Sequence, residues 1–198
     1  ATGVTGLTAT TGKLNIQDVE TVELNATAAN TIDASLFSGV TLLAFSGGTP
    51  GVQTVTNLPA GVAIGIGDAG AEFDNNEDID VSLADETGDA DSLEFKVDNT
   101  SGALTDGDVL TSSTIESVTL NLLDDDTAAN NATISMDKAK AATVTLKGGF
   151  AGQSLTLGTL ADETLTVDAS ALDADFRFTA GTTGSGMTVT TKAAQADT

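Results

Sequence analysis

Apolar residues alternate with small or polar residues over short stretches along most of the chain. In the first stretch Val22 and Leu24 fall on one face, while Thr21 and Glu23 fall on the other. An alternation of period two is typical of a half-buried β-strand, and the abundance of Thr, Val and Ile also favours strands. The same alternation predicts strands at 41–45, 52–55, 62–66, 118–122, 144–146, 155–157 and 165–167.

The predicted strands recur roughly every ten residues, which is typical of β-sandwiches and of β-solenoids. In either architecture the apolar residues of each alternation point into the core. One segment, 135–142 (SMDKAKAA), is compatible with a short helix. The residues expected to point inward are Val22, Leu24, Ile32, Val118, Leu120, Ile134, Leu155, Leu157, Leu165 and Val167.

Short internal echoes occur at several offsets. The stretch VETVELN at 19–25 returns 96 residues later as IESVTLN at 115–121. Two shorter stretches also return: LADET at 83–87 and 160–164, and (I/V)-D-A-S at 32–35 and 167–170. Several different offsets indicate short repeated rungs with insertions, in which each rung buries its apolar face only by stacking on its neighbours.

We therefore predict an all-β fold, a parallel β-solenoid (β-helix) of short rungs, with an immunoglobulin-like β-sandwich as the alternative. Phe is the only aromatic residue type, and the buried Trp and corner Tyr typical of that sandwich are missing from the sequence. One continuous domain is expected. It comprises rungs in 1–68, an acidic insertion in 69–112 that is a candidate calcium-binding segment, and further rungs in 113–198.

Charge and composition exclude several functions. The 198 residues include 29 Asp and Glu but 7 Lys and Arg, which gives a net charge of −22. This excess of negative charge argues against nucleic acid and anionic membranes as partners. No His or Cys is present, so imidazole and thiol catalysts and the usual zinc, copper and haem ligands are missing from the sequence. Oxygen ligands remain, and among metals they favour Ca²⁺.

Nearly half of the acidic residues lie between positions 68 and 108, where 14 carboxylates accompany one basic residue, Lys96. Carboxylates and amides alternate there at every second position, as in a loop that folds around Ca²⁺. An EF-hand is rejected, because Ile79 stands where the loop glycine should be. The candidate calcium ligands are Asp74, Asn76, Asp78 and Asp80, followed by Asp85, Asp89, Asp91, Asp106 and Asp108.

The alternative to a calcium site is a solvated acidic surface. Repulsion argues against it, since close like charges near a protein surface repel by up to about 4 kcal/mol before screening. A bound divalent cation would remove this repulsion and make folding depend on calcium. The chain would then stay loose in cytosol and fold outside the cell.

Catalytic patterns are weak. Paired carboxylates such as Asp162 and Glu163 are unavoidable in so acidic a chain, and no Trp or Tyr is present to form a sugar-binding platform. The glycines at 61, 65 and 67 are not followed by a lysine that could meet a phosphate. We therefore expect a chain that is not an enzyme. Both ends are polar and of low complexity, as expected of a piece of a longer protein, and no leader or membrane-spanning run is recognised.

Taken together, the (V/I)-E-(T/S)-V-x-L-N strand, the T-(I/V)-D-A-S step, the strands ending in Gly-Gly and the cysteine-free composition resemble bacterial surface-layer proteins of the RTX type. The resemblance implies a secreted, structural β-solenoid repeat domain that self-assembles into a calcium-dependent lattice on the cell surface. Its partners would be copies of itself, with outer-membrane lipopolysaccharide contacted through other parts of the parent protein and without insertion into the membrane. The calcium-binding nonapeptide G-G-x-G-x-D of that family is missing, so its ligands are not transferred to this chain.

Two other functions stay open. A domain of a large secreted RTX-type adhesin would bind a receptor or glycan and occur in tandem copies. A polysaccharide-acting enzyme would show a groove with converging carboxylates.

Overall fold

The computed structural model describes residues 19–25, 29–46, 51–66, 78–97, 104–111, 114–123, 131–149, 151–179 and 186–192. Within these residues the backbone forms β-strands and a short 3₁₀ turn, η1. They are β1 (Thr21–Asn25), β2 (Asn30–Asp33), η1 (Ala34–Leu36), β3 (Leu42–Ser46), β4 (Gln53–Leu58), β5 (Ala63–Ile66), β6 (Ile79–Leu83), β7 (Ser92–Val97), β8 (Leu104–Thr111), β9 (Ser117–Leu122), β10 (Asn131–Met136), β11 (Thr143–Gly148), β12 (Ser154–Leu160), β13 (Thr166–Leu172), β14 (Asp175–Thr179) and β15 (Thr188–Thr191).

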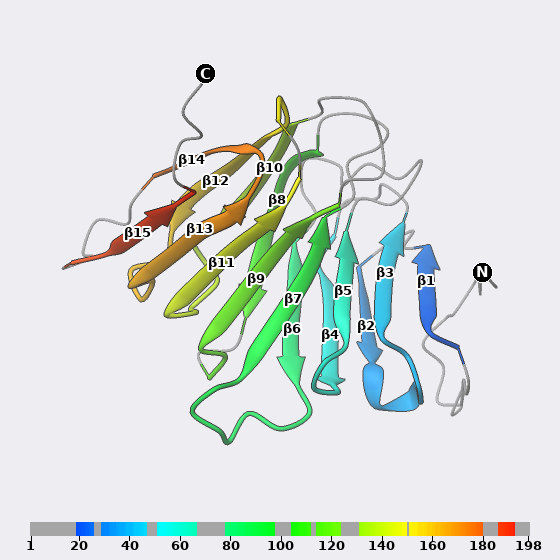
Figure 1. Ribbon diagram of the computed structural model, residues 1–198. Coiled ribbons are helices and arrows are strands. Elements are labelled where there is room, and N and C mark those ends of the chain that lie inside the picture. Colours follow the sequence, from blue (N-terminus) through cyan, green and yellow to red (C-terminus); the bar gives the residue numbers. More distant parts are fainter. Residues whose placement is uncertain are drawn as a thin grey trace.

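Odd-numbered and even-numbered strands form two separate sheets (Figure 1). The 8-stranded sheet has the order β1-β3-β5-β7-β9-β11-β13-β15, and the 7-stranded sheet has the order β14-β12-β10-β8-β6-β4-β2. Neighbouring strands in both sheets pair in parallel, so each coil of the chain adds one strand to each sheet. The predicted parallel β-solenoid is confirmed, and the immunoglobulin-like sandwich, which requires antiparallel sheets, is wrong.

The length of one coil varies along the solenoid. Thr21 pairs with Leu42, 21 positions later, whereas Ile64 pairs with Phe95, 31 positions later. Since each coil carries two strands, a coil of this size accounts for the close spacing of strands seen in the sequence. The longer coils keep the two sheets in parallel pairing and place their additional residues in the connections.

The core lies between the two sheets and consists of stacked apolar rows. In one row of the 8-stranded sheet, Val22, Leu43, Ile64, Phe95 and Leu120 occupy successive register positions, and each is at most 1% exposed. The predicted inward orientation is confirmed for eight of the ten residues by their burial, and Ile32 packs against the core while only partly buried. Removing such rows from water is the main stabilising contribution expected in this fold.

Leu165 is the inward prediction that is wrong, because its side chain is 52% exposed. The alternation fails here at a corner that precedes β13. Thr164 occupies the buried position instead, and its hydroxyl donates to the Ala141 carbonyl at 3.2 Å. The Leu165 N–H donates to the Ala142 carbonyl at 2.9 Å, so the chain is already joined to the previous coil while the leucine side chain points outward.

The short helix considered at 135–142 is also wrong. Met136 ends β10, a turn follows, and Ala139 forms an isolated parallel bridge with Thr111. Ala139 and Ala141 are both buried, with an exposed Lys140 between them. Burial with period two, together with pairing to a neighbouring coil, outweighs the helix propensity of so short a segment.

The acidic segment 69–112 contributes directly to both sheets. Its described residues form β6 and β8 in the 7-stranded sheet and β7 in the 8-stranded sheet. Ile79, Val81, Leu93, Phe95 and Val97 from these strands are buried in the common core. The acidic residues of this segment are therefore carried on and between strands of the solenoid.

Candidate functional site

The predicted calcium ligands are distributed over two ends of one strand. Asp78 directly precedes β6 and Asp80 lies within it, while Asp85, Asp89 and Asp91 belong to the connection that follows β6. A strand of this length spans about 16 Å at about 3.3 Å per residue, so Asp78 and Asp85 do not share one ion. The structure therefore separates Asp78 from Asp85 and from the ligands that follow it.

The other four ligands are less fully described. Asp74 and Asn76 lie outside the described residues. Asp106 and Asp108 lie in β8, where the backbone pairs with β6 and β10, and their side chains lie outside the described part. Among the described residues, no group of three or more acidic side chains is close enough to hold a metal ion.

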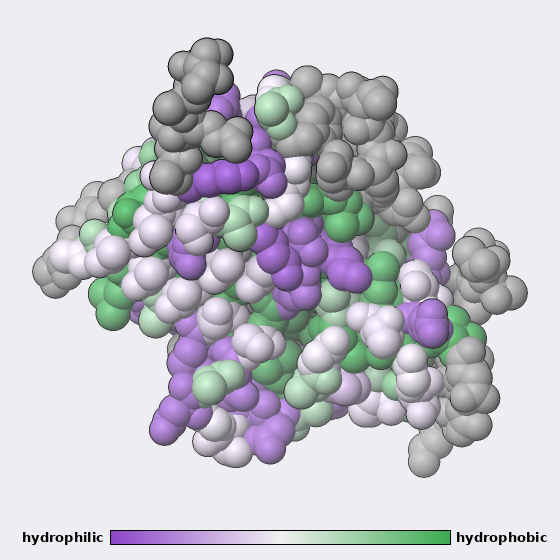
Figure 2. All heavy atoms as spheres, viewed as in Figure 1, coloured by the Kyte–Doolittle hydropathy of each residue, from purple (hydrophilic) through white to green (hydrophobic). Residues whose placement is uncertain are grey.

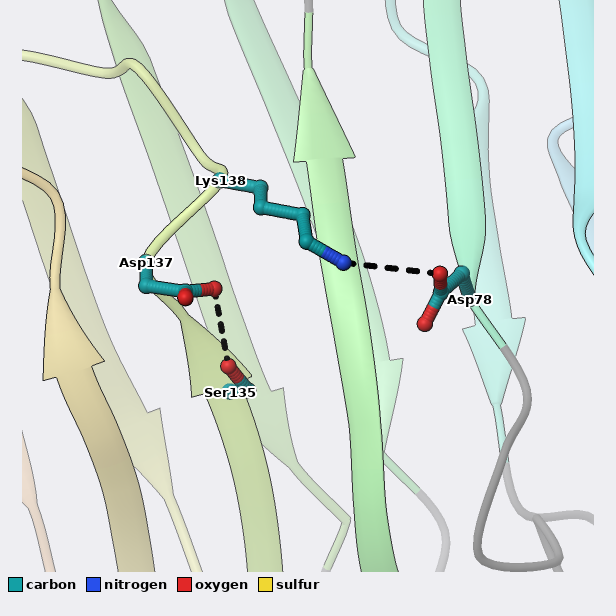
Figure 3. Close-up of polar contacts among 4 residues, drawn as sticks. All are labelled: Asp78, Ser135, Asp137 and Lys138. Atoms are coloured by element: carbon teal, nitrogen blue, oxygen red, sulfur yellow. Dashed lines mark hydrogen bonds and ion pairs between the residues drawn. The ribbon is translucent and has the colours of Figure 1, made fainter.

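Asp78 is paired with a lysine from the turn after β10 (Figure 3). The Lys138 Nζ lies 3.6 Å from the Asp78 Oδ2, and the pair reaches across β8, which separates β6 from β10. In the same turn the Ser135 hydroxyl donates to the Asp137 Oδ1 at 3.1 Å. Both side chains of the ion pair are partly exposed. The pair therefore contributes only roughly 0–1 kcal/mol to the free energy of unfolding.

In the connection between β6 and β7, carboxylates hold the turn together. The two Glu86 carboxylate oxygens accept from the Leu83 N–H at 2.8 Å and from the Thr114 hydroxyl at 2.7 Å. The Asp91 N–H donates to the Glu116 carboxylate at 2.8 Å, which joins this connection to the next coil. The Asp91 Oδ2 is itself buried and accepts no hydrogen bond among the described residues, which is the environment in which a bound cation would be favourable.

A recurring pattern, Asp-x-(Ser/Thr), accounts for three further carboxylates. In the first copy, the Ser35 N–H and hydroxyl donate to the Asp33 Oδ1 at 3.1 and 2.7 Å. Thr87 donates to Asp85 in the same way, and the N–H two residues after Asp168 donates to that carboxylate. In each copy the Ser or Thr two positions after the Asp donates hydrogen bonds from its side chain and from its backbone N–H to the carboxylate. These hydrogen bonds lower the pKa of Asp33, Asp85 and Asp168. Asp33 and Asp85 hold the chain in this way just after β2 and β6, whereas Asp168 lies within β13, next to a register shift in its pairing with β11.

The edge where the odd strands end collects three acidic connections. Ile66, Val97 and Leu122 are register partners near the ends of β5, β7 and β9, and the arrowheads of these strands point to one edge (Figure 1). From that edge the chain continues into 67–77, 98–103 and 124–130, which carry four, one and three acidic residues and no basic one. Sequence reasoning missed this grouping, because 124–130 lies far from the acidic segment along the chain.

The outer face of the 8-stranded sheet is polar and carries ladders of hydroxyl groups. One outward row consists of Ser92, Ser117, Thr143, Thr166 and Thr188, all in register. Figure 2 shows this face with near-white and purple residues over much of its middle. Hydroxyl groups in such a row repeat at the strand spacing of about 4.8 Å, which makes the face regular.

A polar cluster lies on the same face, formed by Glu94, Lys96, Asn121 and Lys147. The Lys147 Nζ lies 3.0 Å from the Glu94 Oε1, and the Asn121 amide donates to the same oxygen at 2.9 Å. Partial burial raises the pKa of Glu94, but the hydrogen bonds from Lys147 and Asn121 and the charges of the two lysines outweigh it. The pKa of Glu94 therefore lies below the ordinary value of 4.5.

Replacing Lys147 by methionine is expected to raise the pKa of Glu94, because burial would then act against a weaker set of stabilising partners. Since the folded pKa is lowered, the carboxylate stabilises the fold above pH 4.5, and this contribution is lost as the pH falls through the folded pKa. An NMR titration of the Glu94 side chain measures the shift. Lys138→Met is the matched control, and an equal effect of both variants would contradict the assignment.

Comparison with known proteins gave no match to a protein-family model, to a curated protein or to a solved structure. Within the described part of the chain, none of the helical segments has the length and apolar character that crossing a bilayer requires.

Proposed function

We propose that this chain is a structural domain of a secreted bacterial cell-surface protein and forms part of a calcium-dependent surface-layer lattice. The observation that carries the proposal is the edge at Ile66, Val97 and Leu122, from which three acidic connections leave neighbouring coils. The proposal assigns no catalysis to the chain, and its partners are further copies of the same protein.

Electrostatic repulsion gives calcium its role in this proposal. Eight acidic residues and no basic residue lie in the three connections, whose flanking strands are adjacent in one sheet. Strands in a sheet are about 4.8 Å apart, so bound counter-ions would reduce repulsion between the acidic residues of successive connections. Calcium suits this purpose because it takes six to eight oxygen ligands in flexible geometry.

The residues fit such an ion by their chemistry. Asp74 and Asn76 lie in the first of the three connections and supply carboxylate and amide oxygens. At the opposite end of β6, the buried Asp91 Oδ2 lacks a hydrogen-bond donor among the described residues. A divalent cation bound at either place would satisfy oxygen atoms that otherwise destabilise the fold.

Calcium is expected to stabilise the folded chain. At a free concentration a hundredfold above the dissociation constant of one site, the free energy of unfolding should rise by about 2.7 kcal/mol. The measurement is a set of melting curves in chelator, in calcium and in sodium at matched ionic strength. Sodium controls for screening, since it shields charge without forming a tight divalent centre.

Two variants with equal loss of charge locate the effect. Asp74→Asn combined with Glu77→Gln removes two carboxylates from the first connection, and should reduce the calcium-dependent shift. Glu20→Gln combined with Glu163→Gln removes two exposed carboxylates elsewhere, and should leave that shift in place. Identical melting curves in chelator and calcium, or full reproduction of the shift by sodium, would contradict the calcium proposal.

Lattice formation is tested separately on the full-length protein that contains this chain. Electron microscopy should show two-dimensional arrays in calcium and their loss in chelator. An adhesin domain is the second candidate, favoured by the regular hydroxyl rows on the outer face of the 8-stranded sheet, which could hydrogen-bond a linear glycan. Saturable binding of a receptor or glycan without arrays would favour the adhesin.

A further inference from the structure

Three side chains on the outer face of the 8-stranded sheet meet at one carboxylate oxygen. The Lys147 Nζ lies 3.0 Å from the Glu94 Oε1, and the Asn121 Nδ2 donates to the same oxygen at 2.9 Å. Glu94, Asn121 and Lys147 come from the neighbouring strands β7, β9 and β11 (Figure 1). Because β9 lies between the other two strands, the lysine side chain has to cross it to reach Glu94. The lysine amine and the asparagine amide are therefore neighbours.

The backbone holds the amine and the amide in this position. Lys147 and Asn121 are register partners, and the pairing of β11 with β9 is unbroken over six pairs. Paired strands are about 4.8 Å apart, a distance that a lysine side chain spans easily. Two reacting groups held side by side in this way react as parts of one molecule, which replaces a chance encounter and greatly raises their effective concentration.

Glu94 is placed to transfer a proton between the two nitrogen atoms. A base acts from a heavy-atom distance of about 2.6–3.2 Å, and both nitrogen atoms lie within that distance of the Glu94 Oε1. A carboxylate can therefore accept a proton from the amine and return it to the amide nitrogen as that nitrogen leaves. Neither contact involves a metal ion or a group outside this chain.

The charges of the cluster make such a reaction slow at neutral pH. The side chains of Lys147 and Glu94 are 39% and 34% exposed, so both are charged in the ion pair of the unlinked chain. The neutral amine is the form that attacks a carbonyl carbon, and its fraction rises with pH. On the same outer face, the titratable groups of the flanking strands are Glu94 and Lys96 on β7 and Asp168 on β13, while β9 carries none.

We propose that Lys147 and Asn121 form an amide bond that joins two successive coils covalently. The Lys147 Nζ passes one proton to Glu94 and attacks the Asn121 Cγ. The Nζ–Cγ bond forms and the Cγ–Nδ2 bond breaks. The Nδ2 atom takes the proton back from Glu94 and leaves as ammonia, which the second proton lost by Nζ converts to ammonium. The carboxylate is regenerated, and no oxidant or other co-reactant is consumed.

This bond has the effect of a disulfide in a chain that contains no cysteine. It closes a loop between positions 121 and 147, ties β9 to β11 and restricts the unfolded chain. The link depends neither on calcium nor on a lattice. It can therefore fail while the proposed function holds, and the reverse is equally true.

The intact mass of the purified chain tests the proposal. The folded chain should be lighter than its sequence by one ammonia, at the latest after incubation at pH 9, where more of the amine is neutral. Trypsin should then give the peptide 97–138 joined to the peptide that contains Lys147, which is no longer cut after that lysine. An unchanged mass, or a loss of ammonia without the joined peptides, overturns the proposal.

Single variants assign the role of each side chain. Lys147→Arg and Asn121→Ala should abolish the link, and Glu94→Gln should slow its formation by about a hundredfold or more. Lys96→Arg is the matched control, because Lys96 flanks Asn121 in the same row from the opposite side. Circular dichroism shows that each variant is folded. A link that persists in Lys147→Arg, or one that is lost in folded Lys96→Arg, contradicts the assignment, and an unchanged rate in Glu94→Gln contradicts the role of Glu94.

Discussion

Replacing Phe95 by alanine is expected to lower the free energy of unfolding by about 3–5 kcal/mol. Phe95 is fully buried and stacks in register between Ile64 and Leu120. The loss combines the transfer of the aromatic ring to water with the cavity that remains. Urea denaturation followed by circular dichroism measures the change.

The position of Phe95 makes a second outcome specific to a solenoid. β5 and β7 share only three register pairs, the shortest pairing in the 8-stranded sheet, and β6 and β8 also share three. Because each coil is stabilised only by its neighbours, weakening this junction should separate unfolding of the N-terminal coils from that of the rest. We therefore expect the Phe95→Ala transition to become broader or biphasic.

Thr119→Ala on the outer face of β9 serves as the control. It removes a partly exposed side chain from the same sheet, next to the inward Val118 and Leu120, and should change stability by about 0.5 kcal/mol or less. A loss for Phe95→Ala as small as for Thr119→Ala would show that the two sheets do not pack on one another at this residue.

The alternation of apolar and polar residues predicted the faces of the strands because that information is local. Val118 and Leu120 are buried as expected, since period two fixes the face of each residue within a strand. Leu165 was misassigned because it lies at a corner, where the backbone direction changes and Thr164 takes the inward position. Corners depend on contacts with the previous coil, which the sequence does not display.

Internal echoes predicted repetition but did not predict register. The sequence aligns Val22 with Val118, whereas the ladder of pairs places Val22 level with Leu120, two residues later. Both alignments bury the same face. Register differs because coils of 21 to 31 residues shift successive strands by the lengths of their connections.

The candidate calcium site was predicted from neighbours in sequence, whereas a solenoid gathers residues one coil apart. Asp78 and Asp85 are close in sequence but lie at opposite ends of β6. Segments 67–77 and 124–130 are far apart in sequence but leave the same edge of one sheet. The Asp-x-(Ser/Thr) pattern is a local signal that could have identified Asp33 and Asp85 as turn-forming carboxylates from the sequence.

Replacing Gly148 by alanine is expected to destabilise the fold by about 4 kcal/mol or more, a loss that requires a specific mechanism. Gly148 ends β11 at a φ of 76°, and an added Cβ would lie 2.1 Å from the Leu122 carbonyl oxygen and 2.8 Å from the Asn121 Oδ1. The first atom is backbone of the neighbouring coil, so relief of the clash would separate β9 from β11. The second belongs to the side chain that donates to Glu94.

Gly61→Ala separates the clash from the backbone conformation. Gly61 has a φ of 81°, but a Cβ added there would meet nothing within 4 Å. The Gly61→Ala variant should therefore be destabilised only by the strain of a left-handed conformation at alanine, about 1–2 kcal/mol. The difference between the two variants in urea denaturation measures how closely successive coils approach at the end of β11. Equal losses would mean that the coils at Leu122 and Gly148 are further apart than this packing requires.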